Sequence, residues 1–241
     1  MIEKAFITDL DGTVIYSHRR VGDTRNMTCV EDQPRYQSYM NTHLYRNLQR
    51  WSDVVPFIPL TTRSEEEYKR IRFPFVPQYA LVGNGAVLLK GGQRVVEWEQ
   101  ETKELIHKEH EVLKNIEAKL VDCLDLYNIQ TLRMVEDAFL FIKTDEAEQL
   151  DYYINRNFDL TDFTLYRHNS KISIVPKKLE KGMAARRLRK FLNIKTIVSA
   201  GDTNMDTSML EYADKTIECD VLKNEGEYIN EQVCKNCKKR K

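Results

Sequence analysis

Short apolar runs alternate with amphipathic stretches in the first and last thirds of the chain. The apolar runs predict buried strands at residues 6–10, 54–60, 79–82, 86–89, 196–200 and 216–219. Apolar residues at helical spacing predict helices at residues 38–51, 181–192 and 204–212, and Ser64 with glutamates behind it predicts the start of a short helix. The polar residues 17–37 interrupt this pattern and predict a long excursion. Strands and helices in alternation are typical of an α/β fold, here a doubly wound, parallel, Rossmann-like sheet.

The middle third of the chain has a different pattern. Gly91 and Gly92 predict a hairpin turn between strands at residues 87–89 and 95–98. A helix, two alternating runs, a second helix and two more strands follow at residues 101–127, 131–135, 138–143, 146–155, 163–167 and 172–175. This order predicts an α+β domain (αββαββ) that is inserted into the first one. We therefore expect a core domain of residues 1–85 and 177–241 and an inserted domain of residues 86–176.

The composition is that of an ordinary globular protein, and it disfavours several classes of function. Of 241 residues, 41% are hydrophobic and 31% are charged, and 37 Lys and Arg balance 37 Asp and Glu. No global charge therefore attracts nucleic acid or anionic lipid. The apolar run at the start is too short for a signal peptide, and no later run is long enough to span a membrane. We expect a cytoplasmic protein with no nucleic-acid or membrane partner; the sequence does not specify its oligomeric state.

The five cysteines are scattered, which favours free thiols in a chain of this kind. Cys234 and Cys237 form a Cys-x-x-Cys pair inside a basic tail. A zinc site needs further ligands at fitting distances, and no second pair exists. A solvated tail is therefore favoured over a metal or redox site.

Two carboxylates follow the first predicted strand, in Thr8-Asp9-Leu10-Asp11-Gly12-Thr13. Side chains two positions apart on a strand share a face, so Asp9 and Asp11 can point the same way. Adjacent carboxylates repel unless a cation lies between them, and Mg²⁺ is a hard cation that prefers oxygen ligands. One carboxylate can then attack phosphorus while the other transfers protons. A plain turn also favours Asp and Gly, so this motif alone is weak evidence.

Three further motifs are candidates for the same site, because ligands of an open parallel sheet bind beyond the carboxyl ends of its strands. Thr61 and Thr62 follow a predicted strand and offer hydroxyls to a phosphate. Lys181 opens a helix, where a cation opposes the helix dipole and is better explained by negative charge in a site. Asp202 and Asp206 follow a buried strand and would add ligands to the same cation. Taken singly, each motif also fits a helix cap or a surface lysine.

As a set, and in this order, the four motifs resemble those of the haloacid dehalogenase-like superfamily. The insert between the second and third motifs resembles the C2-type cap of its Cof-type, sucrose-phosphatase and phosphomannomutase branch. Asn84-Gly85-Ala86 resembles the segment at which that branch enters its cap. The resemblance implies a Mg²⁺-dependent phosphatase that hydrolyses a small phosphorylated metabolite, sugar phosphates first, through an aspartyl phosphate.

The resemblance also implies a role for each motif residue. Asp9 is then the nucleophile and Asp11 the general acid and base. The implied Mg²⁺ ligands are Asp9, Asp11 through its backbone carbonyl, Asp202 and Asp206. The implied phosphate-binding residues are Thr61, Thr62 and Lys181.

Two positions depart from the pattern of the Cof-type proteins. Thr62 stands where they usually have Gly, and Met205 stands where they usually have an Asn that bears on substrate class. Two other functions stay open: a phosphomutase or phosphotransferase that passes the phosphoryl group to a sugar hydroxyl, and a non-catalytic regulatory protein on the same fold. The acids of the motifs are all intact, which favours an enzyme over the regulatory protein.

Overall fold

The computed structural model describes residues 1–34, 36–51 and 55–224. Their contacts divide into two compact units. The first contains the described residues of Met1–Val95 and those from Lys181 to residue 224, and the second is Val96–Glu180. Cys234 and Cys237 lie outside the described residues, whereas Cys29, Cys123 and Cys219 are free thiols.

The first unit is built on a parallel sheet with β1 (Ile2–Thr8) near its centre. Strand β5 (Phe57–Pro59) pairs with one edge of β1, and β13 (Ile194–Ala200) pairs with the other, followed by β14 (Lys215–Thr216). Helices α7 (Lys181–Leu192) and α8 (Thr207–Tyr212) pack against β13. Every residue from Ala5 to Leu10 except Asp9 is at most 1% exposed, so the centre of the sheet is a dry core.

A second, antiparallel sheet extends this unit. A parallel bridge between Leu60 and Leu81 joins it to the first sheet, and β6 (Tyr79–Val82), β7 (Val87–Lys90) and β8 (Gln93–Arg94) follow in order. Asn84 has φ +60° in the turn between β6 and β7. The expected boundary after residue 85 therefore falls inside the first unit, because β7 and β8 pair with β6 and not with the insert.

Residues 17–37 are more regular than the prediction of an excursion. They contain α1 (His18–Val21) and β3 (Met27–Gln33), and β3 pairs with β4 (Tyr36–Asn41) in a hairpin, beside the short β2 (Tyr16–Ser17). The helix predicted from residue 38 begins instead with α2 (Thr42–Trp51). The reason is local: the Asn41 side chain accepts hydrogen bonds from the backbone N–H groups of His43 and Leu44 and so caps the helix there.

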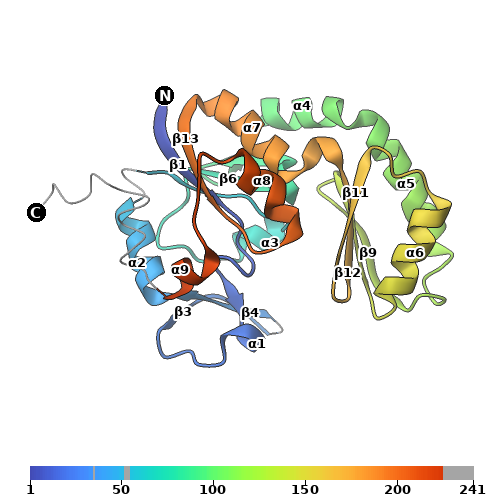
Figure 1. The fold of residues 1–241 in the computed structure, drawn as a ribbon, viewed down its shortest axis with the longest axis horizontal. Helices are drawn as coiled ribbons and strands as arrows, with labels where there is room; N and C mark the ends of the chain where they lie inside the picture. The colour runs from blue at the N-terminus through green and yellow to red at the C-terminus, as the bar shows by residue number, and fades with distance from the viewer. Residues whose placement is uncertain (35, 52–54, 225–241) are drawn as a thin grey trace, which may run out of the picture. The chain divides into compact units, whose positions relative to one another are not determined.

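The second unit has the predicted order of elements. Its antiparallel sheet runs β11 (Phe163–His168), β12 (Lys171–Pro176), β10 (Phe139–Thr144), β9 (Ile129–Val135). Helices α5 (His107–Val121) and α6 (Ala147–Asn157) lie on the same side of this sheet (Figure 1) and share one apolar core with it. The predicted class, a parallel-sheet core with an inserted α+β domain, is confirmed.

Two details of the second unit were predicted wrongly. Residues 96–98 are not a strand but the start of α4 (Val96–Leu105). The single helix predicted at residues 101–127 is broken at Ile106, which has φ −112° and ψ 16° and is 3% exposed. Neither Gly nor Pro marks this break in the sequence.

Among the described residues, no helix is both long enough and apolar enough to cross a membrane. The cytoplasmic location stays a prediction.

Candidate active site

The site begins where two neighbouring strands of the parallel sheet end. Strands β1 and β13 run side by side, with Thr8 opposite Ala200, and the backbone N–H of Asp9 donates to the Ala200 carbonyl at 3.0 Å. In the strand order, β5 lies on one side of β1 and β13 lies on the other. The carboxyl end of β1 is therefore a topological switch point. Open α/β sheets bind ligands at such points, beyond the carboxyl ends of the strands.

Three carboxylates meet at this edge. Asp9 follows β1, and Asp202 and Asp206 follow β13; one oxygen from each lies within 4.8 Å of the others. Asp9 is 6% exposed and Asp206 is fully buried. The Thr203 backbone N–H and hydroxyl both donate to Asp206 Oδ2 at 2.9 Å. Asp206 ends the 3₁₀ turn Asn204–Asp206, and these bonds hold its carboxylate against Thr203, which precedes the turn.

Lys181 supplies the positive charge inside this cluster. It is the first residue of α7 and is 1% exposed, and its Nζ lies 2.6 Å from Asp9 Oδ1 and 2.6 Å from Asp206 Oδ1. Its neighbour Gly182 allows the close approach of α7 to α8, because a Cβ there would lie 2.4 Å from the Ser208 carbonyl oxygen. A buried ammonium group is tolerable only with such partners.

Burial and the neighbouring charges shift the pKa values of the three carboxylates. Burial is the largest influence on Asp9 and raises its pKa to about 7; the neighbouring acids add to this, and Lys181 opposes it. Burial and the charge of Asp206 raise the pKa of Asp202. Burial also acts to raise the pKa of Asp206, but Lys181 outweighs it and holds that pKa below its usual range. The Lys181 ammonium group and the Arg20 guanidinium, 3.5 Å from Asp202, do not neutralise three carboxylates, so a further cation would be stabilised here.

The loop after Asp9 closes over the carboxylates. Thr13 Oγ1 lies 3.3 Å from Asp9 Oδ2 and 3.3 Å from Asp202 Oδ1, within hydrogen-bonding distance of both. Gly12 has φ +96°, and a Cβ there would lie 2.1 Å from Asp202 Oδ2. Arg20, from α1, reaches Asp202 Oδ2 at 3.5 Å.

The threonines of the second motif lie just beyond β5. Thr61 is fully buried, and its Oγ1 accepts a hydrogen bond from the backbone N–H of Arg63 at 3.2 Å. The Thr61 backbone bonds to Leu81 and Asn84, so β6 fixes its position. Thr62 is half-buried beside it. Binding of phosphate by either residue stays a prediction.

Comparison with known families decides what kind of protein this is. The sequence model of the family described as haloacid dehalogenase-like hydrolase matches residues 78–220, which is more than half of the chain. The chain belongs to this family. The matched part of this haloacid dehalogenase-like hydrolase contains Lys181, Asp202 and Asp206, whereas Asp9 and Asp11 precede it. No curated protein sequence matches the chain.

Solved structures share the fold of this hydrolase at low sequence identity. The sucrose-phosphatase from Synechocystis sp. PCC6803, in complex with sucrose and phosphate, is 17% identical with a TM-score of 0.60, over 90% of this chain and 83% of that one. A trehalose-6-phosphate phosphatase related protein is 15% identical with a TM-score of 0.56, over 95% and 98% of the two chains. A haloacid dehalogenase-like hydrolase from B. subtilis is 16% identical with a TM-score of 0.53, over 91% and 99%. These similarities show that the chain shares its fold with the three proteins.

The carboxylates of the hydrolase fit a divalent metal ion. Among the described residues, the possible metal ligands that meet at the site are carboxylate oxygens of Asp9, Asp202 and Asp206. Hard cations such as Mg²⁺ bind oxygen ligands of this kind, whereas zinc sites usually include His or Cys. The donor set and the raised pKa values of Asp9 and Asp202 therefore agree with the divalent metal that the family generally uses.

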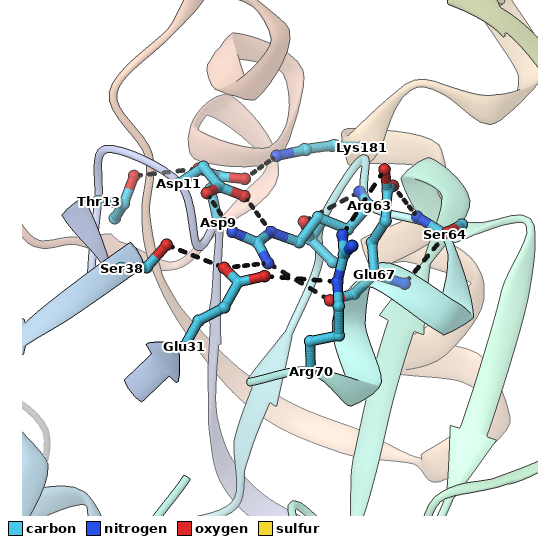
Figure 2. Close-up of polar contacts among 11 residues, drawn as sticks. Asp9, Asp11, Thr13, Glu31, Ser38, Arg63, Ser64, Glu67, Arg70 and Lys181 are labelled. Carbon is cyan, nitrogen blue, oxygen red and sulfur yellow. Dashed lines mark hydrogen bonds and ion pairs between the residues drawn. The ribbon is translucent and has the colours of Figure 1, made fainter. Parts of the chain in front are cut away.

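The Asp11 side chain is held apart from this cluster. Arg63 binds both of its oxygens, with Nε 2.7 Å from Oδ2 and Nη2 2.8 Å from Oδ1. Arg63 Nη1 in turn donates to Glu31 Oε2 at 2.9 Å, so the guanidinium lies between the two carboxylates (Figure 2). Sequence reasoning gave Arg63 and Glu31 no role. Arg63 directly follows the two threonines at a strand end, a signal that could have been used, but nothing local marks Glu31.

Proposed function

We propose that this hydrolase is a Mg²⁺-dependent phosphatase that acts on a small phosphorylated metabolite, with Asp9 as the nucleophile. One observation carries the proposal: the buried Asp9 carboxylate is held by Lys181 at 2.6 Å beside two further carboxylates, at the switch point of the sheet. A nucleophile, a cation that can grip phosphoryl oxygens and a set of metal ligands thus lie together.

The chain's own residues can carry out a two-step transfer. An oxygen of Asp9 attacks phosphorus as the ester bond to the leaving oxygen breaks, and Asp11 gives that oxygen a proton. Asp11 then takes a proton from water, which attacks phosphorus and releases Asp9 and inorganic phosphate. Lys181, Thr61 and Thr62 hold the phosphoryl oxygens throughout.

Mg²⁺ fits this scheme as a resident cofactor. Asp9, Asp202 and Asp206, with the Asp11 backbone carbonyl, would hold it. The bound ion supplies positive charge that offsets the charge of the phosphoryl oxygens.

The substrate class is the finer part of the proposal. The sucrose-phosphatase of the same fold is seen with sucrose and phosphate, which supports sugar phosphates as the first class to test. We further propose that the second unit, Val96–Glu180, is the C2-type cap that selects the substrate.

A panel of phosphate esters with Mg²⁺ tests the function. We expect wild type to release inorganic phosphate from sugar phosphates, and Asp9→Asn to lose at least about 10³-fold in kcat, the scale on which loss of a nucleophile acts. Asp23→Asn is the matched control, since Asp23 is an exposed residue that pairs with Arg25. An Asp9→Asn protein as active as wild type would remove the proposed nucleophile. Phosphate transfer that requires an added sugar acceptor would identify a phosphotransferase instead.

A further inference from the structure

Glu31 is a buried carboxylate that the proposed reaction does not use. It lies on β3, in the hairpin Met27–Asn41, and is 2% exposed. Ser38 Oγ donates to its Oε2 at 2.9 Å, Arg63 Nη1 donates to the same oxygen at 2.9 Å, and Arg70 Nε lies 3.4 Å from its Oε1. A carboxylate is costly to bury without such partners, so its place in the fold requires an explanation.

Arg63 connects this buried carboxylate to the site. Its side chain is 14% exposed, and each of its three nitrogens has an oxygen partner: Nε and Nη2 bind Asp11, and Nη1 binds Glu31 at 2.9 Å and the Glu67 carbonyl at 3.3 Å. A planar guanidinium with both ends occupied cannot swing away without breaking charged hydrogen bonds. Glu31 is the charged and closer partner of Nη1, so together with the Glu67 carbonyl it fixes the orientation in which Arg63 binds Asp11 (Figure 2).

Asp11 needs an external support of this kind. Its side chain is 51% exposed, and it directly precedes Gly12, whose φ is +96°. A half-exposed carboxylate samples several rotamers, whereas proton transfer requires it within hydrogen-bonding reach of one oxygen atom. During transfer one oxygen of Asp11 leaves the fork to carry the proton, while the other oxygen keeps its bond to Arg63.

We propose that Glu31 is a positioning residue for Asp11 and acts through Arg63, so that the hairpin Met27–Asn41 is part of the proton-transfer machinery. The inference rests on the proposed function, in which Asp11 is the general acid and base. The competing explanation is that Glu31 only stabilises the packing of the hairpin against the chain around Arg70. Other contacts also stabilise that packing: the Arg72 N–H donates to the Val30 carbonyl at 2.7 Å, and Arg70 lies over the Tyr36 ring.

The test compares two leaving groups. A sugar or alkyl phosphate needs a proton on its leaving oxygen, whereas p-nitrophenyl phosphate does not. The ratio kcat/KM covers the steps up to the aspartyl phosphate and so reports this protonation. For Arg63→Met we expect a loss of about 10²-fold on the sugar phosphate and at most about 3-fold on p-nitrophenyl phosphate. For Glu31→Gln we expect kcat/KM to fall about 10-fold on the sugar phosphate and again little on p-nitrophenyl phosphate.

Two further variants separate positioning of Asp11 from stabilisation of the packing. Arg70→Met removes the other arginine of Glu31 but leaves the pair between Arg63 and Asp11, so any loss should be equal on both esters. Adding Glu31→Gln to Arg63→Met should cause no additional loss in kcat/KM, because Glu31 acts through Arg63. If Glu31→Gln does not fold, Arg63→Lys tests the same link, since a lysine cannot bind both oxygens of Asp11 and Glu31 together.

The outcomes are distinct for the two proposals. Equal losses on both esters in Glu31→Gln, or additive losses in the double variant, overturn the positioning role and leave the phosphatase proposal intact. A wild type that hydrolyses no ester, or an active Asp9→Asn, overturns the proposed function and this inference together.

Discussion

Gly12 lies so close to Asp202 that a side chain at this position would displace a carboxylate of the site. A Cβ there would lie 2.1 Å from Asp202 Oδ2, at a φ of +96°, whereas Gly22, with φ +66°, has open space around it. Both positions disfavour alanine by about 1 kcal/mol for backbone reasons, but only Gly12→Ala must also displace a carboxylate of the site. We expect Gly12→Ala to lose at least about 10-fold in kcat and Gly22→Ala to stay within about 3-fold.

Steady-state kinetics on one sugar phosphate, with thermal unfolding as a check on folding, measures the difference between the two glycine variants. Similar losses of kcat in both would show that backbone strain, and not the approach to Asp202, limits Gly12.

At this scale the sequence predicts the residues that follow strand ends and misses those joined only by the fold. Asp9, Asp202 and Lys181 occur in local patterns, and the structure brings them together. Their roles stay predictions. Arg63 and Glu31 are 32 positions apart, and the pair exists only because a hairpin of polar sequence folds against the second motif. No local pattern encodes that contact, since register in such a hairpin is set by distant packing.

Elements were predicted best where the apolar period was strong. The helix start at Ser64 and the strands of the insert were predicted from sequence, and the structure adds that Ser64 and Glu67 form a capping box. The hairpin Met27–Asn41 was missed because polar residues alternate in it without a clear apolar face. The break at Ile106, a buried residue, was missed because no helix-breaking residue marks it in the sequence.

Within the second unit, an ion pair joins α5 to the end of the unit, close to Glu180. Lys178 Nζ lies 2.7 Å from Glu109 Oε1, and Glu109 is 5% exposed on α5. Burial acts to raise the pKa of Glu109, but the hydrogen bond and charge of Lys178 outweigh it and hold the pKa below its ordinary value of 4.5. The pair therefore stabilises the folded state fully above that value, and the stabilisation is lost as pH falls through the lowered pKa.

We expect Lys178→Met to lower the melting temperature at about pH 7, and the difference from wild type to shrink at about pH 4. Thermal unfolding at the two pH values measures this. Lys103→Met is the control, because its pair with Glu99 involves a lysine side chain that is 70% exposed, and exposed pairs contribute little. A difference for Lys178→Met that is the same at both pH values would show that lost packing, and not the ion pair, is responsible.

On the scale of the whole molecule, the inserted unit ends directly before a residue of the site. The second unit ends at Glu180, and the next residue is Lys181, whose ammonium group holds Asp9 and Asp206. The αββαββ order of the insert was predictable because its helices and strands each carry a clear period. Its boundaries were not predictable, because the sequences of β7 and β8 resemble strands of the insert. Only their pairing with β6 assigns them to the first unit.

Because the carboxylate cluster lies wholly in the first unit, Mg²⁺ should stabilise that unit selectively. A ligand that binds only the folded state at 100 times its Kd adds about 2.7 kcal/mol, which corresponds to roughly 5–10 °C in melting temperature for a unit of this size. We expect this rise in calorimetry with Mg²⁺ against EDTA. Hydrogen exchange should show added protection around residues 8–13 and 200–206, and none within Val96–Glu180. Asp202→Asn should abolish most of the rise, because it removes the negative charge of one ligand without adding bulk. A rise that is undiminished in Asp202→Asn, or protection spread over both units, would mean that the ion binds elsewhere.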